Sequence, residues 1–289
     1  MLEAPEALCL SEQLTRTLKG KRITEAIAGY TPHKFTWFYG RPETYPDLLS
    51  GKTIGVSRAY GGMVEIEIGE MRLLFSDGAN LRYLAPGAPL PKKHQLLLGF
   101  EDDSCLTVSV RMYGGICCLP PETPGWSLQS YYDSAKQKPQ VMSDAFDLAY
   151  FLRLIRGEGV REKSAKAFLA TGQTIPGLGN GVLQDILYKA RIHPKTRIGT
   201  LTDAEYETLF RALKDTLNEI YRKNGRRTET DLFGRQEGYV PFLGNDTVGA
   251  PCPRCGEILC KDAYLGGSIY YCPGCQPVPE MKKRIPDSD

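Results

Sequence analysis

The strongest constraint on the fold is a set of four cysteines near the carboxyl end of the sequence. They form two CxxC pairs joined by a longer spacer: Cys252, Cys255, Cys272 and Cys275. Two such pairs supply four thiolates for a tetrahedral Zn²⁺ ion, which is the pattern of a zinc ribbon. The spacer, residues 258–271, predicts a hairpin with Gly266 and Gly267 at its tip. The alternative is a redox role for the two pairs, and we favour structural Zn²⁺.

Length and composition set broader limits. A chain of 289 residues holds two compact domains and a small third one. The net charge of +2 does not identify a partner, so any nucleic-acid site must come from local clustering of charge. No apolar run reaches the roughly 18 residues of a membrane span, and the first residues lack a signal-peptide pattern. The remaining cysteines show no disulfide framework, which indicates a reducing cytoplasm: Cys9, Cys105, Cys117, Cys118 and Cys260.

A glycine-rich turn followed by a helix is predicted at residues 175–194. Ile175-Pro176 favours an extended or turn segment, and apolar residues then recur at helical spacing. Gly179 and Asn180 therefore lie near a helix start, where free N–H groups favour an anion. Basic or titratable residues alternate after the helix: Lys189, Arg191, His193, Lys195 and Arg197. The segment suits a nucleic-acid phosphate, but a glycine-rich loop between core helices is equally compatible with it.

The first part of the chain predicts one helix followed by strands. Pro5 suits a first helical turn, and Leu10, Leu14 and Leu18 form an apolar stripe that ends at Gly20. Residues 21–119 contain alternating or apolar runs, such as 63–68 and 95–100, separated by turn residues. This spacing predicts an antiparallel sandwich.

The second part predicts helices. Residues 120–140 are polar and proline-rich, so we expect an interdomain hinge. Ser143-Asp144 are expected to cap a helix that continues through Ile155, and residues 163–171 predict another. Thr202 and Glu205 form a capping-box pattern for a long helix to Lys223. A second basic cluster follows, and alone it is typical of a solvated helix end: Arg222, Lys223, Arg226 and Arg227.

These motifs together resemble those of the formamidopyrimidine-DNA glycosylase and endonuclease VIII family. The PG-x-GN turn ending at Asn180, the HP after the helix, and the finger ending in YCPxCQ all match. The resemblance covers nearly the whole chain. It implies an α+β fold with an N-terminal antiparallel β-sandwich and N-terminal helix, a helix–two-turn–helix domain and a C-terminal zinc ribbon. The expected boundaries are 1–125, a linker at 126–140, 141–235 and 236–289, with DNA in the cleft between the domains.

The resemblance also implies site residues. Asn180, with Gly179, corresponds to the contact to the DNA backbone, and Lys195 adds a basic contact. Arg111 and Tyr113, in the segment 109–114, correspond to the side chains that fill the gap left by a flipped base. Without the family, the same segment is equally well a turn with a half-buried tyrosine. His94 falls where the family has a histidine after a basic run.

The family's catalytic positions are only partly present. Family members begin P-E-L-P-E, where the terminal proline amine attacks the sugar C1′ and the next glutamate moves protons. Glu3, Pro5 and Glu6 match, but Leu2 stands at the position of the nucleophilic proline. The family's lysine after the strand that starts at Arg58 is absent, and Gly267 stands at the position of the finger arginine.

Because Leu2 replaces the family's proline, we expect another amine to act as the nucleophile. Enzymes that remove the initiator methionine require a small second residue, so the large Leu2 predicts that Met1 stays on the chain. An α-amine has a pKa of roughly 8 and is partly unprotonated at neutral pH. We therefore expect lyase chemistry at the Met1 amine, with Glu3 or Glu6 moving protons. Gly61 and Gly62, which replace a long side chain, are expected to leave room for the extra residue.

The resulting hypothesis is a DNA-repair glycosylase with AP-lyase activity that excises oxidised bases. The competing hypothesis is a catalytically weakened or inactive family member that binds damaged or bent DNA. A third, a zinc-ribbon protein that recruits other proteins, leaves residues 1–235 unexplained. We expect a cytoplasmic monomer without membrane association, nucleoid-associated in a bacterium. Its partner would be damaged duplex DNA, including abasic sites.

Overall fold

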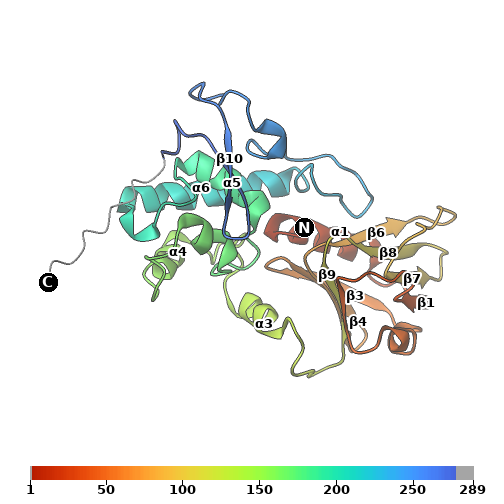
Figure 1. Cartoon of the computed structure of the whole chain (residues 1–289). Coiled ribbons are helices and arrows are strands. Elements are labelled where there is room, and N and C mark those ends of the chain that lie inside the picture. Colours follow the sequence, from red (N-terminus) through yellow and green to blue (C-terminus); the bar gives the residue numbers. More distant parts are fainter. Residues whose placement is uncertain (1, 278–289) are drawn as a thin grey trace. The chain divides into compact units, whose positions relative to one another are not determined.

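The computed structural model describes residues 2–277, and these form two compact units (Figure 1). The first unit contains the residues up to Phe146, Ile175–Leu178 and Lys214–Pro241. The second contains Asp147–Thr174, Gly179–Leu213 and the residues from Phe242 onward. Each unit is therefore assembled from separated segments of the chain.

The first unit is a sandwich of two β-sheets, as the strand spacing predicts. One sheet has the order β2-β9-β5-β4-β3 and the other the order β1-β7-β8-β6. Side chains from both sheets share one buried core, which includes Ile66 and Phe75 from the first sheet and Leu98 and Val108 from the second. The strands are β1 (Ile23–Ala28), β2 (Thr36–Tyr39), β3 (Ile54–Tyr60), β4 (Met63–Ile68), β5 (Met71–Phe75), β6 (Ala79–Leu84), β7 (Leu96–Phe100), β8 (Cys105–Val110) and β9 (Gly114–Leu119).

One strand pair departs from the predicted antiparallel arrangement. β2 runs parallel to β9, with Thr36 opposite Gly114 and Trp37 opposite Gly115. The other strand pairs of the sandwich are antiparallel. Parallel neighbours need a long connection, which the intervening strands provide here. This pairing makes β2 an edge strand beside the loop that precedes β9.

Helices cover both outer parts of the sandwich. Helix α1 (Ala4–Leu18) buries its predicted leucine stripe in the shared core, and the Oγ1 of Thr15 accepts the Ser57 N–H at 2.9 Å. A short turn, η1 (Pro42–Thr44), leads into α2 (Tyr45–Leu49). The segment 120–140, for which the composition predicts an interdomain hinge, contains α3 (Gln129–Gln137). Tyr132 and Ala135 of α3 are buried three positions apart, and this packing overrides the polar composition.

The second unit is mainly helical, with elements α4 (Leu148–Ile155), η2 (Ala167–Thr171), α5 (Asn180–Ala190), η3 (Ile198–Thr200), the start of α6 (Asp203–Arg222), and η4 (Asn245–Thr247). The predicted cap of α4 at Ser143-Asp144 is wrong. Asp147 caps this helix instead, since its carboxylate accepts the Tyr150 N–H at 2.7 Å. The capping box of α6 is confirmed: the Thr202 N–H donates to Glu205 Oε2 at 2.7 Å, and the Glu205 N–H donates back to Thr202 Oγ1 at 3.3 Å.

The predicted hairpin between the cysteine pairs is present in the second unit. β10 (Cys260–Tyr264) and β11 (Gly267–Tyr271) are antiparallel, with Tyr264 opposite Gly267. Leu265 and Gly266 form the tip, and both have positive φ. Within residues 2–277, no helix is long and apolar enough to cross a bilayer.

Candidate active site and metal centre

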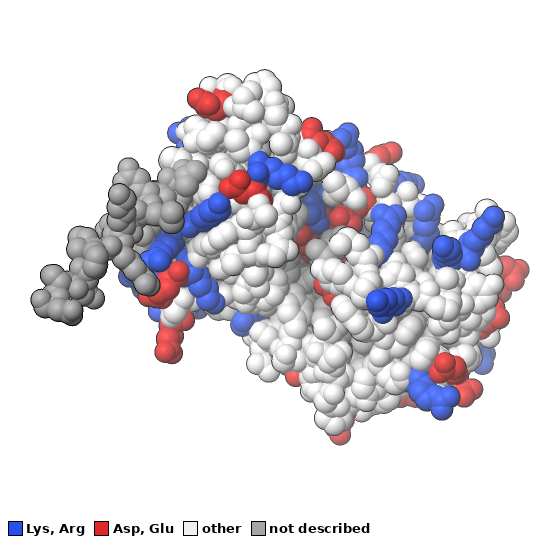
Figure 2. Space-filling view, in the orientation of Figure 1, with Lys and Arg blue, Asp and Glu red and all other residues white. Residues whose placement is uncertain are grey.

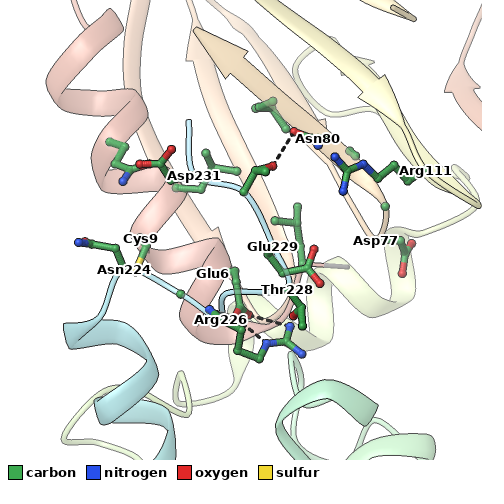
Figure 3. Close-up of a pocket in the computed structure, with 18 of the residues that line it drawn as sticks. Glu6, Cys9, Asp77, Asn80, Arg111, Asn224, Arg226, Thr228, Glu229 and Asp231 are labelled. Atoms are coloured by element: carbon green, nitrogen blue, oxygen red, sulfur yellow. Dashed lines mark hydrogen bonds and ion pairs between the residues drawn. The ribbon is translucent and has the colours of Figure 1, made fainter. Parts of the chain in front are cut away.

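A polar cavity of about 200 Å³ lies in the first unit (Figure 3). Three parts of the chain line it: α1, the turns at the ends of β5 and β8, and the segment 224–231 after α6. In Figure 3, Arg226 lies against Glu6, and Glu229 comes from the same segment as Arg226. The arrangement brings charged side chains from distant parts of the sequence to one cavity.

A buried ion cluster lies at this cavity, and two of its members, Glu6 and Arg226, line it. The Arg226 guanidinium contacts Glu6 at 2.7 Å (Nε to Oε1) and Glu3 at 3.5 Å (Nη1 to Oε1), and all three side chains are buried. Burial alone would lower the pKa of Arg226, but the two carboxylates raise it above its usual value. The sequence pattern is typical of a solvated helix end here, and for Arg226 that prediction is wrong.

Leu2, the first described residue, lines the cavity. Its N–H donates to the Asp77 carbonyl at 2.7 Å, and the Ala4 N–H donates to the Gly177 carbonyl at 2.8 Å. The Leu2 side chain is partly buried against the core of the sandwich. The Leu2 nitrogen is thus a hydrogen-bonded peptide nitrogen, which is not a nucleophile. Met1, the predicted source of the amine, lies outside the described residues.

The two glycines at positions 61 and 62 do not leave the open space that we expected. A Cβ on Gly61 would lie 2.6 Å from the Tyr131 hydroxyl and 2.9 Å from Pro176 Cβ. A Cβ on Gly62 would lie 2.9 Å from the Leu2 carbonyl oxygen. The glycines therefore serve close approach between backbone segments, and the Tyr131 hydroxyl oxygen accepts the Gly62 N–H at 3.1 Å.

Asp77 is a cavity residue that the motif analysis missed. It has a left-handed backbone, with φ 54°, and its carboxylate accepts the Ser76 hydroxyl at 3.0 Å. Burial raises the pKa of Asp77 above its usual value, and the Ser76 hydrogen bond opposes that shift. A lone aspartate in a Ser-Asp-Gly turn is an ordinary turn residue, so the sequence carried no signal for it.

The turn at Asp77 is bonded to the loop that carries Arg111 and Tyr113. The Gly78 N–H donates to the Tyr113 carbonyl, and the Arg111 N–H donates to the Gly78 carbonyl, both at 2.9 Å. A Cβ on Gly78 would lie 2.0 Å from the Arg111 carbonyl oxygen, so glycine is required there. Arg111 is exposed and lines the cavity, while Tyr113 is half-buried and lies near Trp37.

His94 differs from an exposed surface histidine. It is buried, its ring stacks on Tyr30 with centroids 4.5 Å apart, and its Nδ1 lies 3.2 Å from the Pro91 carbonyl oxygen. Its ring therefore contributes to packing at this end of the sandwich.

A second group of predicted residues meets at the start of α5 in the second unit. Gly179 is the extended N-cap and Asn180 is the first helical residue. A Cβ on Gly267, at the hairpin, would lie only 2.5 Å from Asn180 Nδ2 and 3.4 Å from Lys166 Nζ. Lys166 is buried, donates to the Tyr264 carbonyl at 2.5 Å, and has its pKa lowered by burial. The space that a side chain at position 267 would need is thus occupied by Asn180 and Lys166.

Two residues of the basic run near the end of α5 do not contribute a full positive charge to the surface. Lys195 pairs with Asp262 at 2.9 Å. His193 is buried with its ring edge against Tyr271, and burial, followed by the Lys195 charge, lowers its pKa to about 4. His193 is therefore neutral at physiological pH, and Lys195 is partly compensated.

The four cysteines of the two CxxC pairs converge at one point. Their Sγ atoms all lie within 4.8 Å of one another, and Cys252 Sγ is 3.8 Å from Cys275 Sγ. A tetrahedral ion with metal–sulfur distances of about 2.3 Å requires sulfur–sulfur separations of about 3.8 Å, so the donor set fits such an ion. The nearby Cys260 lies in β10 outside the cluster, and all nine cysteines carry free thiols.

Hydrogen bonds attach this cysteine cluster and its hairpin to α5. The Gln184 carboxamide bonds both Ser268 O and Tyr270 N, at 3.3 and 3.1 Å. Asp185 accepts the N–H groups of Phe242 and Leu243 at 2.9 Å each. Gln184 thus fixes the hairpin against the helix that begins at Asn180.

Comparison with known proteins decides the family. No family model matches the chain. The formamidopyrimidine-DNA glycosylase of Alkalilimnicola ehrlichii is 31% identical over 96% of this chain and 100% of its own length. The chain belongs to the formamidopyrimidine-DNA glycosylase family. The enzyme of that name from Lactococcus lactis is 27% identical, with 96% of this chain and 99% of the relative covered.

Solved structures show the same fold. A complex of Lactococcus lactis Fpg with DNA containing an abasic site has a TM-score of 0.80 at 24% identity, and covers 96% of this chain and 100% of that one. A complex of MutM with DNA containing carbocyclic 8-oxo-G has a TM-score of 0.79 at 23% identity, with 96% and 100% covered. The expected α+β fold, with its sandwich, helices and finger, is therefore confirmed.

Proposed function

We propose that this protein is a DNA-repair glycosylase with AP-lyase activity that removes oxidised bases. The observation that carries the proposal is membership of the formamidopyrimidine-DNA glycosylase family along the whole chain. Solved relatives hold DNA with an abasic site or 8-oxo-G, which supports damaged DNA as the partner. The glycosylase is preferred to the non-cutting binder because Glu3 and Glu6 are both present and both contact Arg226, and a binder has no evident need of both.

The cavity of the first unit is proposed to receive the extruded base. An enzyme that acts on a base inside a duplex must take that base out of the stack and hold it in a pocket. The polar lining, with Asp77, Asn80 and Glu229 around the Arg226 cluster, suits the hydrogen-bonding edge of a base. Arg111 and Tyr113 are proposed to fill the gap that the base leaves in the stack.

Glu3 is proposed to move protons, with Glu6 in a supporting role. Glu6 has both carboxylate oxygens bonded to Arg226, at 2.7 and 3.1 Å, so it is held as a fixed counter-ion. Glu3 contacts the same guanidinium at the longer distance of 3.5 Å. In the proposed reaction an amine of the chain bonds to C1′, the bond from C1′ to the base breaks, and the base leaves with a proton. The nucleophile is the α-amine of Met1.

The start of α5 is proposed to hold the DNA backbone. Gly179 and Asn180 form the start of an eleven-residue helix, whose dipole favours an anion, and the buried Lys166 ammonium lies beside them. Lys195 adds a weaker contact because Asp262 competes for its charge. His94 keeps only a packing role in this proposal.

The metal of the cysteine cluster is proposed to be a structural Zn²⁺, held by Cys252, Cys255, Cys272 and Cys275. Four sulfur donors without an open position suit a structural rather than a catalytic ion. The ion would stabilise the hairpin that packs on Asn180. The proposal also includes a monomer that acts in the cytoplasm.

Purified protein incubated with oxidised-base, abasic and undamaged duplexes tests the function. We expect base release and strand cleavage at the damaged position only. The Glu3→Gln variant should lose about 10²- to 10⁴-fold in rate, the usual contribution of a positioned proton carrier. Tight binding to all damaged duplexes without any cleavage would reject the glycosylase in favour of the binder.

A further inference from the structure

Two large aromatic side chains are exposed on the edge strand β2 and beside it. Trp37 is 43% exposed and Phe35 is 50% exposed. Along the same face of the sheet, Tyr39 packs against a cluster that contains Trp126 and Tyr132, so this part of the face is covered. The residues that cover Tyr39 do not extend to Trp37. Contiguous exposed apolar surface of this kind marks a binding site.

The exposed pair is joined to the loop that carries Arg111 and Tyr113. The Gly114 N–H donates to the Phe35 carbonyl at 3.0 Å, and the parallel register places Trp37 opposite Gly115. The rings of Trp37 and Tyr113 have centroids 5.9 Å apart. Met112, within the loop, is 73% exposed. We call these four residues the aromatic edge: Phe35, Trp37, Met112 and Tyr113.

The segments that carry or adjoin the aromatic edge contain more cations than carboxylates. Three segments, 28–41, 85–100 and 105–121, form this end of the sandwich and contain no aspartate or glutamate. The Thr31 N–H bonds the His94 carbonyl at 3.0 Å, which joins the first two segments. Figure 2 shows Lys and Arg side chains gathered over the part of the first unit where Figure 1 labels β6 and β8. The cations of the three segments are Lys34, Arg41, Lys92, Lys93 and Arg111.

Aromatic rings among cations are the pattern of a surface that binds single-stranded nucleic acid. Two carboxylates lie nearby, because Asp77 is next to the Arg111–Tyr113 loop and Glu43 pairs with Arg41 at 3.7 Å. The cations attract the phosphates, and each exposed ring offers a flat face to a base. In a closed duplex both faces of every base are covered by its neighbours. An unpaired base has a free face, so an exposed ring can stack on an unpaired base and not on a base inside a closed duplex.

We propose that the aromatic edge stacks unpaired bases of DNA beside the extruded nucleotide. The protein then binds a damaged site within a short unpaired region more tightly than the same site in a continuous duplex. This inference rests on the proposed function, because it takes the Arg111–Tyr113 loop as the one that faces the DNA. Loss of one stacked base should weaken binding about tenfold, within the range measured for aromatic stacking surfaces.

Tryptophan fluorescence provides a direct test on the full chain. The sequence has two tryptophans, of which Trp126 is buried at 7% exposure and Trp37 is exposed. The protein is titrated with an abasic-site duplex and with the same strands carrying a few mismatched pairs around the site. We expect the mismatched DNA to quench the emission of Trp37 and to bind more tightly.

Variants separate stacking from other effects. Trp37→Ala should lose about tenfold in affinity for the mismatched DNA and keep its affinity for the duplex. Trp37→Phe retains a ring and should keep both affinities while it loses the quenching. Phe233→Ala, an exposed aromatic residue that contacts Tyr83, is the control and should change neither. Retained duplex affinity also shows that a variant is folded.

The outcomes distinguish this inference from the proposed function. Normal duplex binding without Trp37 quenching, and without any effect of Trp37→Ala on the mismatched DNA, would overturn the inference alone. Equal weakening of both DNAs by Trp37→Ala would overturn it as well. If the wild-type protein binds no damaged DNA of either form, both proposals fail.

Discussion

Arg226 donates two hydrogen bonds to Glu6, 2.7 Å from Nε to Oε1 and 3.1 Å from Nη2 to Oε2. The two residues are 220 positions apart in the sequence, and both are buried. Their contact ties the N-terminal helix α1 to the segment that follows α6. The N-terminal glutamates that are proposed to take part in the chemistry are thus bonded to a residue that follows α6 in the sequence.

Removal of Arg226 should destabilise the protein strongly. Arg226→Ala leaves the Glu3 and Glu6 carboxylates buried beside each other without a cation, and breaking such a buried pair costs about 3–5 kcal/mol. Arg227→Ala removes an exposed neighbour of the same type and should change the free energy of unfolding by less than about 0.5 kcal/mol. Denaturant unfolding of both variants measures the difference. Equal effects would mean that the pairing does not hold the site together.

Asp77 should make stability depend on pH in a defined direction. Its pKa in the folded protein is raised above the usual value of about 4. The folded state keeps the Asp77 proton to higher pH than the unfolded state does. Deprotonation of Asp77 therefore lowers the free energy of unfolding, beginning near pH 4 and in full above the raised pKa. Asp77→Asn should therefore raise Tm at pH 7 and leave it unchanged at pH 3. A lower Tm at pH 7 would show that the charged carboxylate stabilises the fold.

Gly267 should influence DNA binding through Asn180. A side chain at position 267 displaces the Asn180 amide, which lies 2.5 Å from the Cβ position. Gly267→Ala and Asn180→Ala should each weaken duplex binding, and the double variant should be no weaker than the worse single one. Ser268→Ala, at the next position of β11, is the control for changes in the hairpin itself. Additive losses would indicate that the two positions act separately.

The cysteine cluster should be needed for the hairpin and not for the sandwich. Cys272→Ser removes one of four sulfur donors, and structural metal binding is coupled to folding of such a site. We expect loss of bound zinc in elemental analysis and rapid hydrogen exchange in β10 and β11, with slow exchange kept in the sandwich strands. Cys260→Ser, in the same hairpin but outside the cluster, should retain the metal. Metal-free wild-type protein with a protected hairpin would refute a structural role.

Local patterns in the sequence predicted the parts of the fold that depend on near neighbours. The two CxxC pairs, the Thr202–Glu205 capping box and the leucine stripe of α1 each lie within a few residues or in one repeating pattern. Helix α3 was missed because two buried positions, Tyr132 and Ala135, stabilise it through packing against the sheet.

The candidate site could be predicted less well than the fold, because its geometry depends on contacts between distant parts of the sequence. Motif matching brought Glu3, Glu6 and Asn180 to attention, but it gave no sign that Arg226 pairs with the two glutamates across the chain. It also could not show that Gly267 is required by the Asn180 amide, or that Asp77 lines the cavity. Each of these facts comes from two segments meeting in space, for which a single sequence has no local pattern.

Trapping with borohydride tests the central claim most directly, because it detects the covalent imine between protein and DNA. Wild-type protein is mixed with an abasic duplex, reduced, digested and mapped by mass spectrometry. The proposed mechanism predicts an adduct at the α-amine of residue 1, which Glu3→Gln forms more slowly. Clear binding to the abasic duplex with no adduct, or an adduct confined to an internal lysine, would contradict it.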